Sequence, residues 1–196
     1  MKRTLFIILL SLIMFDYAYS QPSGLEKFNA NRNQINTYAM LTLGGWALGN
    51  MAVNGALYRS GEKDRKYLYE MNIAWNAVNL AIAGFGLYGA LNPEQGLTMF
   101  ESIQQQNGIE KILLFNAGLD VGYMMTGAYL MERSKNSVKH EHRLKGYGKS
   151  LILQGGFLFA FDLIVYFIHT GNHQLMKSLL EHVALSGNGI GVTFTF

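Results

Sequence analysis

The sequence predicts an all-α membrane protein in which four transmembrane helices form a bundle. Three observations support this fold class. Four mostly apolar segments occur, each carries polar side chains at helical spacing, and basic residues gather in two of the three connecting loops. About twenty residues of helix rise about 30 Å, the thickness of the hydrocarbon core of a bilayer. The chain is 49% hydrophobic and 15% charged, and both values depart from those of soluble domains toward those of membrane proteins.

The first twenty residues have the pattern of a cleaved secretory signal peptide. Lys2 and Arg3 precede a short apolar run, and the small residues Ala18 and Ser20 mark a cleavage site. The chain therefore divides into a signal peptide at 1–20, a periplasmic segment at 21–37, a four-helix domain at 38–169 and a periplasmic C-terminal region at 170–196. The four predicted helices are Tyr38–Tyr58, Met71–Leu91, Ile112–Met131 and Leu151–His169.

Basic residues indicate how these segments cross the membrane. The loop after the first segment holds four cations and the loop after the third holds six, whereas the middle loop, Asn92–Glu110, holds three glutamates and no cation. Because Lys and Arg accumulate on the cytoplasmic side, the expected location is the bacterial inner membrane, multi-pass, with both termini periplasmic. After removal of residues 1–20, 14 basic and 12 acidic residues remain, an excess too small to indicate nucleic-acid binding.

Each segment places polar side chains on one helix face, which predicts a shared polar interior. Asn50 and Asn54, for example, lie four residues apart and are neighbours on a helix. Polar groups cost free energy in hydrocarbon and should face one another. The predicted polar intramembrane cluster consists of Asn50, Asn54, Asn72, Asn76, Asn79, Asn116, Asp120, Tyr123, Gln154, Asp162, Tyr166 and His169.

The two aspartates of this cluster differ from the amides. An ionised carboxylate at mid-depth costs at least about 2.5 kcal/mol, and neither the segment of Asp120 nor that of Asp162 contains a lysine or arginine. The asparagines fit ordinary hydrogen bonding between helices. The aspartates are expected to hold protons or to bind a cation.

Glycines predict where the helices approach one another. Gly45 and Gly49 lie four residues apart, as do Gly118 and Gly122, and such small residues let helix backbones come close in membranes. The sequence therefore predicts that these four positions face a neighbouring helix. The same is expected of the glycines in the other two segments: Gly84, Gly86, Gly89, Gly155 and Gly156.

The two helical hairpins of the domain resemble each other. Residues 54–60 and 126–134 each contain a Gly-Ala pair and lead into a basic loop, and Gly55 and Gly127 are 72 residues apart. A tandem repeat of two hairpins with the same orientation accounts for this similarity. The composition of membrane hairpins accounts for it equally well.

The C-terminal region is expected to dock rather than to cross the membrane. Apolar residues at helical intervals over Gln174–Leu185 predict a short amphipathic helix at the bilayer surface. Ile190–Phe196 alternates apolar with small or polar residues, which predicts a strand. Because an isolated strand is unstable, it is expected to pair, and an envelope protein is one candidate partner.

Three stretches, Gly45–Asn50, Leu114–Tyr123 and Gln154–Phe157, resemble a family of small uncharacterised bacterial membrane proteins. The resemblance covers roughly Phe28–His169. It implies four helices and a membrane location, and it implies no particular chemistry.

Three interpretations of function remain. The sequence favours a structural or assembly subunit of a bacterial envelope complex; the alternative is a small oligomeric carrier or ion-coupled permease that uses the intramembrane carboxylates. An enzyme is least favoured, because the sequence offers no nucleophile–base pair. The histidines at 140 and 142, and at 169 and 173, lack further ligands, and the chain has no cysteine, so neither a metal site nor a cofactor is expected.

Overall fold

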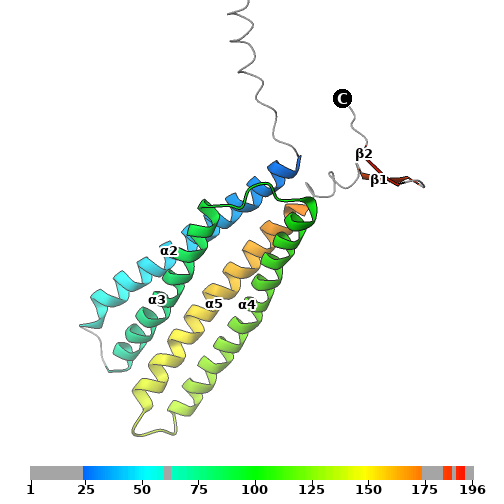
Figure 1. The fold of residues 1–196 in the computed structure, drawn as a ribbon. Coiled ribbons are helices and arrows are strands. Elements are labelled where there is room, and N and C mark those ends of the chain that lie inside the picture. The colour runs from blue at the N-terminus through cyan, green and yellow to red at the C-terminus, as the bar shows by residue number, and fades with distance from the viewer. Residues whose placement is uncertain (1–23, 60–62, 174–182, 187–188, 193–196) are drawn as a thin grey trace, which may run out of the picture.

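The structure, a computed structural model, describes residues 24–59, 63–173, 183–186 and 189–192. It contains four long helices: α2 (Gly24–Tyr58), α3 (Lys63–Leu91), α4 (Met99–Ser134) and α5 (Glu141–Gly171). A short antiparallel hairpin follows, made of β1 (Val183–Ser186) and β2 (Gly189–Val192). The all-α bundle of four helices is confirmed (Figure 1). The predicted signal peptide lies outside the described residues.

The helices end close to their predicted positions but begin earlier. α2 begins at Gly24 instead of Tyr38, and α4 begins at Met99 instead of Ile112. The first turns of both helices are polar, so a search for apolar segments could not find them. Thr98 and Glu101 form a capping box at the start of α4, which fixes this boundary because each side chain accepts a hydrogen bond from the other's backbone N–H. With 36 residues, α4 is about 54 Å long, longer than the hydrocarbon core of a bilayer.

The four helices form two hairpins that pack through α3 and α5. α2 pairs with α3 and α4 pairs with α5, whereas the backbones of α3 and α4 do not come close to each other within the part of the chain that the structure describes. The start of α2, the α3–α4 loop and the end of α5 lie at one end of the bundle, the terminal end (Figure 1). The end of α2, the start of α3 and the α4–α5 loop lie at the opposite end, the loop end. Both hairpins therefore have the same orientation, as a tandem repeat would require.

Glycines allow α4 and α5 to approach closely. A Cβ atom on Gly127 would lie 2.6 Å from the carbonyl oxygen of Gly148, and a Cβ atom on Gly148 would lie 2.6 Å from that of Gly127. Further along, a Cβ atom on Gly155 would lie 2.9 Å from the carbonyl oxygen of Asp120. Since these contacts are to backbone atoms, which cannot rotate away, each position requires glycine.

The predicted glycine contacts are right at Gly86, which approaches Met40 of α2, and at Gly155, which approaches α4. They are wrong for the four glycines of the first and third segments, where a Cβ atom would have no neighbour within 4 Å and which lie on the exposed outside of the bundle: Gly45, Gly49, Gly118 and Gly122. The polar residues of these two segments lie on the opposite helix face, and that face is the packed one.

The bundle has a polar interior and an apolar exterior. Among the described residues, 15 polar or charged side chains are buried, against 10 hydrophobic ones. The small apolar core consists of Ala39, Leu43, Ala83, Leu113, Phe161 and Val165. Large aromatic side chains lie outside instead: Phe85 is 80% exposed, Phe115 67% and Phe167 65%. This distribution is the inverse of that in a water-soluble protein.

Two of the four helices are long and apolar enough to cross a membrane. They are α3, over Arg65–Leu91, and α5, over Glu141–Gly171. α2 and α4 carry more amide side chains and do not reach the same hydropathy among the described residues.

The C-terminal region departs from the prediction. Val183–Leu185 belongs to β1, so the predicted amphipathic helix is wrong over these three residues; residues 174–182 lie outside the described part. The strand predicted at Ile190–Phe196 is confirmed over Ile190–Val192, which belongs to β2 and pairs with β1 of the same chain, with Leu185 opposite Ile190. Residues 193–196 lie outside the described part.

Candidate functional site

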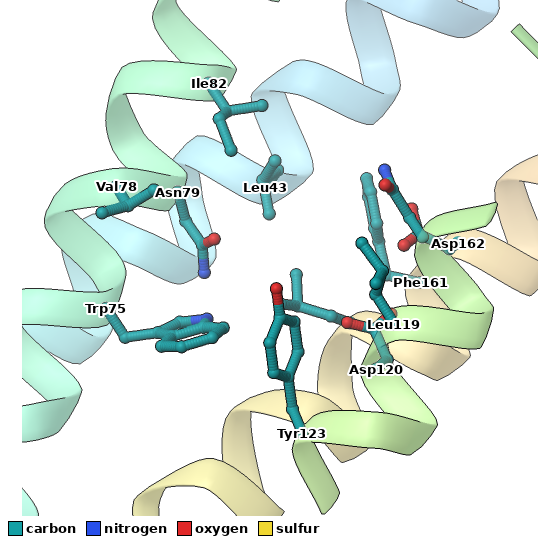
Figure 2. A pocket seen from close by; sticks show the side chains of 12 residues that line it. Leu43, Trp75, Val78, Asn79, Ile82, Leu119, Asp120, Tyr123, Phe161 and Asp162 are labelled. Carbon is teal, nitrogen blue, oxygen red and sulfur yellow. The ribbon is translucent and has the colours of Figure 1, made fainter. Parts of the chain in front are cut away.

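A cavity of about 220 Å³ lies near the middle of the bundle, and all four helices line it. Leu43 comes from α2, Asn79 from α3, Asp120 and Tyr123 from α4, and Asp162 from α5 (Figure 2). The cavity occupies the space between the backbones of α3 and α4, and it reaches the exterior of the bundle at Val78, Ile82 and Leu119, which line it and are exposed. We call it the central cavity.

Two carboxyl groups share one side of the central cavity. The side chains of Asp120 and Asp162 hydrogen-bond to each other, and the two residues are only 3% and 6% exposed. The close approach of Gly155 to the backbone of Asp120 positions them, because Asp162 follows Gly155 by two helical turns on the same face. Ionised carboxylates only accept hydrogen bonds, so at least one of the two carboxyl groups holds a proton.

Three polar atoms that belong to residues lining the cavity are buried without a hydrogen-bond partner. They are Nε1 of Trp75, Nδ2 of Asn79 and Oδ2 of Asp120. The indole ring of Trp75 packs edge-on against the ring of Tyr123, with their centroids 4.7 Å apart. A buried polar group without a partner costs about 1–3 kcal/mol. The cavity therefore presents two donors and one acceptor that the described chain does not satisfy.

A second group of polar residues, the asparagine network, joins α2, α3 and α5 toward the loop end. It consists of Asn50, Asn54, Asn72, Ser150 and Gln154. Asn72 is its centre: Nδ2 donates to Oδ1 of Asn54 at 2.9 Å, and Oδ1 accepts from Nε2 of Gln154 at 3.1 Å and from the Ser150 hydroxyl. Asn50 accepts a longer bond from Gln154, at 3.5 Å. These side chains satisfy one another, as expected of groups that hold helices together.

A third group, the arginine–histidine cluster, lies at the terminal end and consists of Arg32, Gln106, Glu110, His169 and His173. Gln106 donates to Glu110 at 2.8 Å and to the backbone oxygen of His169 at 3.0 Å. His173 approaches Glu110 to 3.1 Å. Within the described part of the chain, no three such residues are placed to hold a metal ion.

Sequence analysis missed most of the arginine–histidine cluster. Arg32 is 2% exposed and donates to the backbone oxygen of Ser102 and to Gln105. Gln106 and Glu110 lie four residues apart and so share a helix face, but both precede the apolar segment Ile112–Met131 that predicted the third helix. A search that began at the capping box would have found them.

The residues of the predicted polar intramembrane cluster are thus divided among three sites and two separate positions. Asn79, Asn116, Asp120, Tyr123 and Asp162 line the central cavity, four others belong to the asparagine network, and His169 belongs to the arginine–histidine cluster. Asn76 is buried and donates to the backbone oxygen of Asn72. Tyr166 packs against the apolar core, and its ring meets that of Phe167 at 5.4 Å.

Trp75 is the cavity residue that the sequence did not reveal. It precedes Asn79 by four residues and so shares its face. In an apolar segment, however, the sequence does not distinguish a tryptophan that faces the interior from one that faces lipid.

Fold and site together define a four-helix protein with a polar interior and a central acidic cavity. Residues 42–163, more than half of the chain, match the model of a family of unknown function, DUF6992, and the chain belongs to this family. The predicted resemblance to an uncharacterised family is confirmed. The matched residues run from just before Leu43 to just after Asp162, so they span the central cavity. No curated protein and no solved structure matches the chain.

Proposed function

We propose that this protein is an integral membrane protein of the carrier type, whose four helices cross the bilayer and whose central cavity binds a small polar solute. The observation that carries the proposal is a bundle with polar side chains inside and apolar side chains outside, which contains a cavity whose lining residues have polar atoms without hydrogen-bond partners. In this proposal the basic loops at the loop end face the cytoplasm of a bacterial cell, and lipid surrounds the exposed apolar side chains.

The apolar exterior supports the membrane location. In the described part of the chain, 25 large hydrophobic side chains are exposed. Each forgoes about 1.5–3 kcal/mol when it stays in water, so the sum reaches tens of kcal/mol, more than the net stability of a typical domain. In α3, 17% of the most apolar window is buried, and in α5 33%. Core helices of soluble proteins are mostly buried, so lipid is the environment that fits both helices.

The contrast between the asparagine network and the central cavity supports solute binding. A purely structural polar interior should satisfy its own hydrogen bonds, as Asn72 and its partners do. In the described chain, six buried polar atoms have no partner, and three of them belong to residues of the central cavity, namely Trp75, Asn79 and Asp120. The other three belong to Asn76, Gln106 and His169. The position of the central cavity near the middle of the helices is also where carriers commonly bind their substrates.

Thiol labelling tests whether the cavity contains water. The chain has no cysteine, so Tyr123→Cys introduces a single thiol at the cavity. Tyr129→Cys is a matched control on the same helix, because Tyr129 is 61% exposed on the apolar exterior. In native membranes a small water-soluble thiol reagent should modify Tyr123→Cys and leave Tyr129→Cys intact. Equal protection of both would contradict a hydrated binding cavity, and modification of Tyr129→Cys would contradict the lipid environment.

A specific observation favours one second candidate, an assembly subunit of an envelope complex. The β1–β2 hairpin contacts none of the described helices, and each of its strands has one edge without a partner in the described sheet. A two-stranded hairpin is marginally stable alone, and a partner protein could extend it by strand addition. Pull-down from solubilised native membranes distinguishes the candidates. A partner that is lost on removal of residues 183–196, and retained in Asp120→Asn, would support the assembly role.

A further inference from the structure

We propose that the ligand of the central cavity is a small organic ammonium compound that also carries a hydrogen-bond-accepting oxygen. The proposal rests on the proposed function, because it names the class of solute that the same cavity binds. Three properties of the cavity lead to it: the charge of its carboxyl pair, the polarity of its unpartnered donors and its volume.

The carboxyl pair requires one positive charge. In the proposed binding state Asp120 and Asp162 share one proton in their mutual hydrogen bond and carry one negative charge between them. No lysine, arginine or histidine is among the residues that line the described cavity. An uncompensated charge costs several kcal/mol in a low-dielectric interior. A single ammonium group would neutralise the pair and donate to the free Oδ2 of Asp120.

The unpartnered donors require an acceptor on the same ligand. The indole Nε1–H of Trp75 can only donate a hydrogen bond, and Nδ2 of Asn79 is the second donor. A bare metal cation would be repelled by these N–H groups, because their hydrogen atoms carry partial positive charge and would point toward it. A hydroxyl or carboxyl oxygen on an organic ligand satisfies them instead. The aromatic faces of Trp75 and Tyr123, whose centroids lie 4.7 Å apart, provide a further surface that suits a cation.

The volume restricts the ligand to a small molecule. The cavity measures about 220 Å³, which equals the liquid volume of about seven water molecules. A ligand of roughly ten non-hydrogen atoms or fewer therefore fits. Larger organic cations would have to separate α3 from α4.

Three probes of equal size test separately whether the ligand needs a positive charge and whether it needs a hydrogen-bond acceptor. Ethanolamine carries both an ammonium group and a hydroxyl; propylamine replaces the hydroxyl by a methyl group, and ethylene glycol replaces the ammonium by a second hydroxyl. The protein is the full chain, purified in detergent with the substitution Trp46→Phe. Because the chain has two tryptophans, Trp75 is then the only one, and its fluorescence and indole N–H resonance report on the cavity. Trp46 stacks on Phe157 at 3.7 Å, and phenylalanine keeps that stacking.

Ethanolamine should bind saturably and shift the Trp75 indole N–H resonance. Ethylene glycol should bind at least about tenfold more weakly because it lacks the charge, and propylamine should bind without shifting the N–H resonance because it lacks the acceptor. Asp120→Asn should weaken ethanolamine binding at least about tenfold. Asp162→Asn provides a second isosteric variant, and Glu132→Gln is the control, since Glu132 pairs with Lys135 on the surface.

Each contrary result overturns the proposal in a recognisable way. Equal binding of ethylene glycol and ethanolamine would show that the carboxyl pair does not select for charge. Absence of ethanolamine binding, with Tyr123→Cys still reactive in membranes, would refute the ligand class and leave the solute-binding cavity intact. An unreactive Tyr123→Cys would instead refute the proposed function itself.

Discussion

Replacing Gly127 by alanine should force α4 and α5 apart. The new Cβ atom would lie 2.6 Å from the carbonyl oxygen of Gly148 and 2.8 Å from Cγ1 of Ile152. Ordinary van der Waals contact begins at 3.4 Å, so the two backbones must separate by about 0.8 Å at this crossing. Overpacking of this kind costs about 1–3 kcal/mol, and the higher helix propensity of alanine offsets about 1 kcal/mol of it. We expect Gly127→Ala to lower the free energy of unfolding by up to about 2 kcal/mol.

Gly122→Ala is the matched control for this prediction. Gly122 lies on the same helix, and a Cβ atom there would have no neighbour within 4 Å, so only the propensity gain remains and stability should rise by up to about 1 kcal/mol. Unfolding by SDS in mixed micelles, followed by far-ultraviolet circular dichroism, measures both variants. If Gly127→Ala were as stable as Gly122→Ala, the glycine-mediated crossing of α4 and α5 would be refuted.

Two further predictions concern the capping box and the asparagine network. Thr98→Ala should cost about 1 kcal/mol of stability. Hydrogen bonds from the Thr98 backbone N–H and hydroxyl lower the pKa of Glu101, so the stabilisation by the ionised Glu101 is present above the pKa that this residue has in the unfolded chain and is lost as the pH falls through its pKa in the folded protein. Glu101→Gln should abolish that part of the pH dependence in thermal melts. Asn72→Ala removes three side-chain hydrogen bonds to α2 and α5 and should cost roughly 2 kcal/mol. The exposed Asn92, which bonds only within its own turn, should tolerate alanine with a change below about 0.5 kcal/mol. Equal effects at Asn72 and Asn92 would contradict the network.

The helices could be predicted from the sequence where they consist of long runs of apolar residues. Long apolar runs, each ending at a polar or basic loop, fix the C-terminal ends of α2 and α3 at Tyr58 and Leu91, as the structure has them. Their N-terminal turns lie among polar residues, and their stability comes from contacts such as those of Arg32 with α4. Such contacts join residues about 70 positions apart, and no local pattern reveals them.

The candidate site could be predicted in part, for the same reason. Asp120 and Asp162 stood out because they are the only carboxylates in their segments, and the structure brings them into contact. Their contact depends on Gly155, whose close approach to the backbone of Asp120 joins two helices and leaves no local signal in the sequence. The role of Trp75 depends on the gap between α3 and α4, which is a property of packing rather than of local sequence.

The central claim is that the four helices cross a bilayer with their polar groups inside. Two single-cysteine variants test it most directly, because the chain has no cysteine of its own. Gln95→Cys lies in the exposed α3–α4 loop at the terminal end, and Val138→Cys lies in the fully exposed α4–α5 loop at the loop end. In sealed inner-membrane vesicles of known orientation, a membrane-impermeant maleimide should label Val138→Cys from the cytoplasmic side and Gln95→Cys from the opposite side only. Labelling of both from one side would contradict the account.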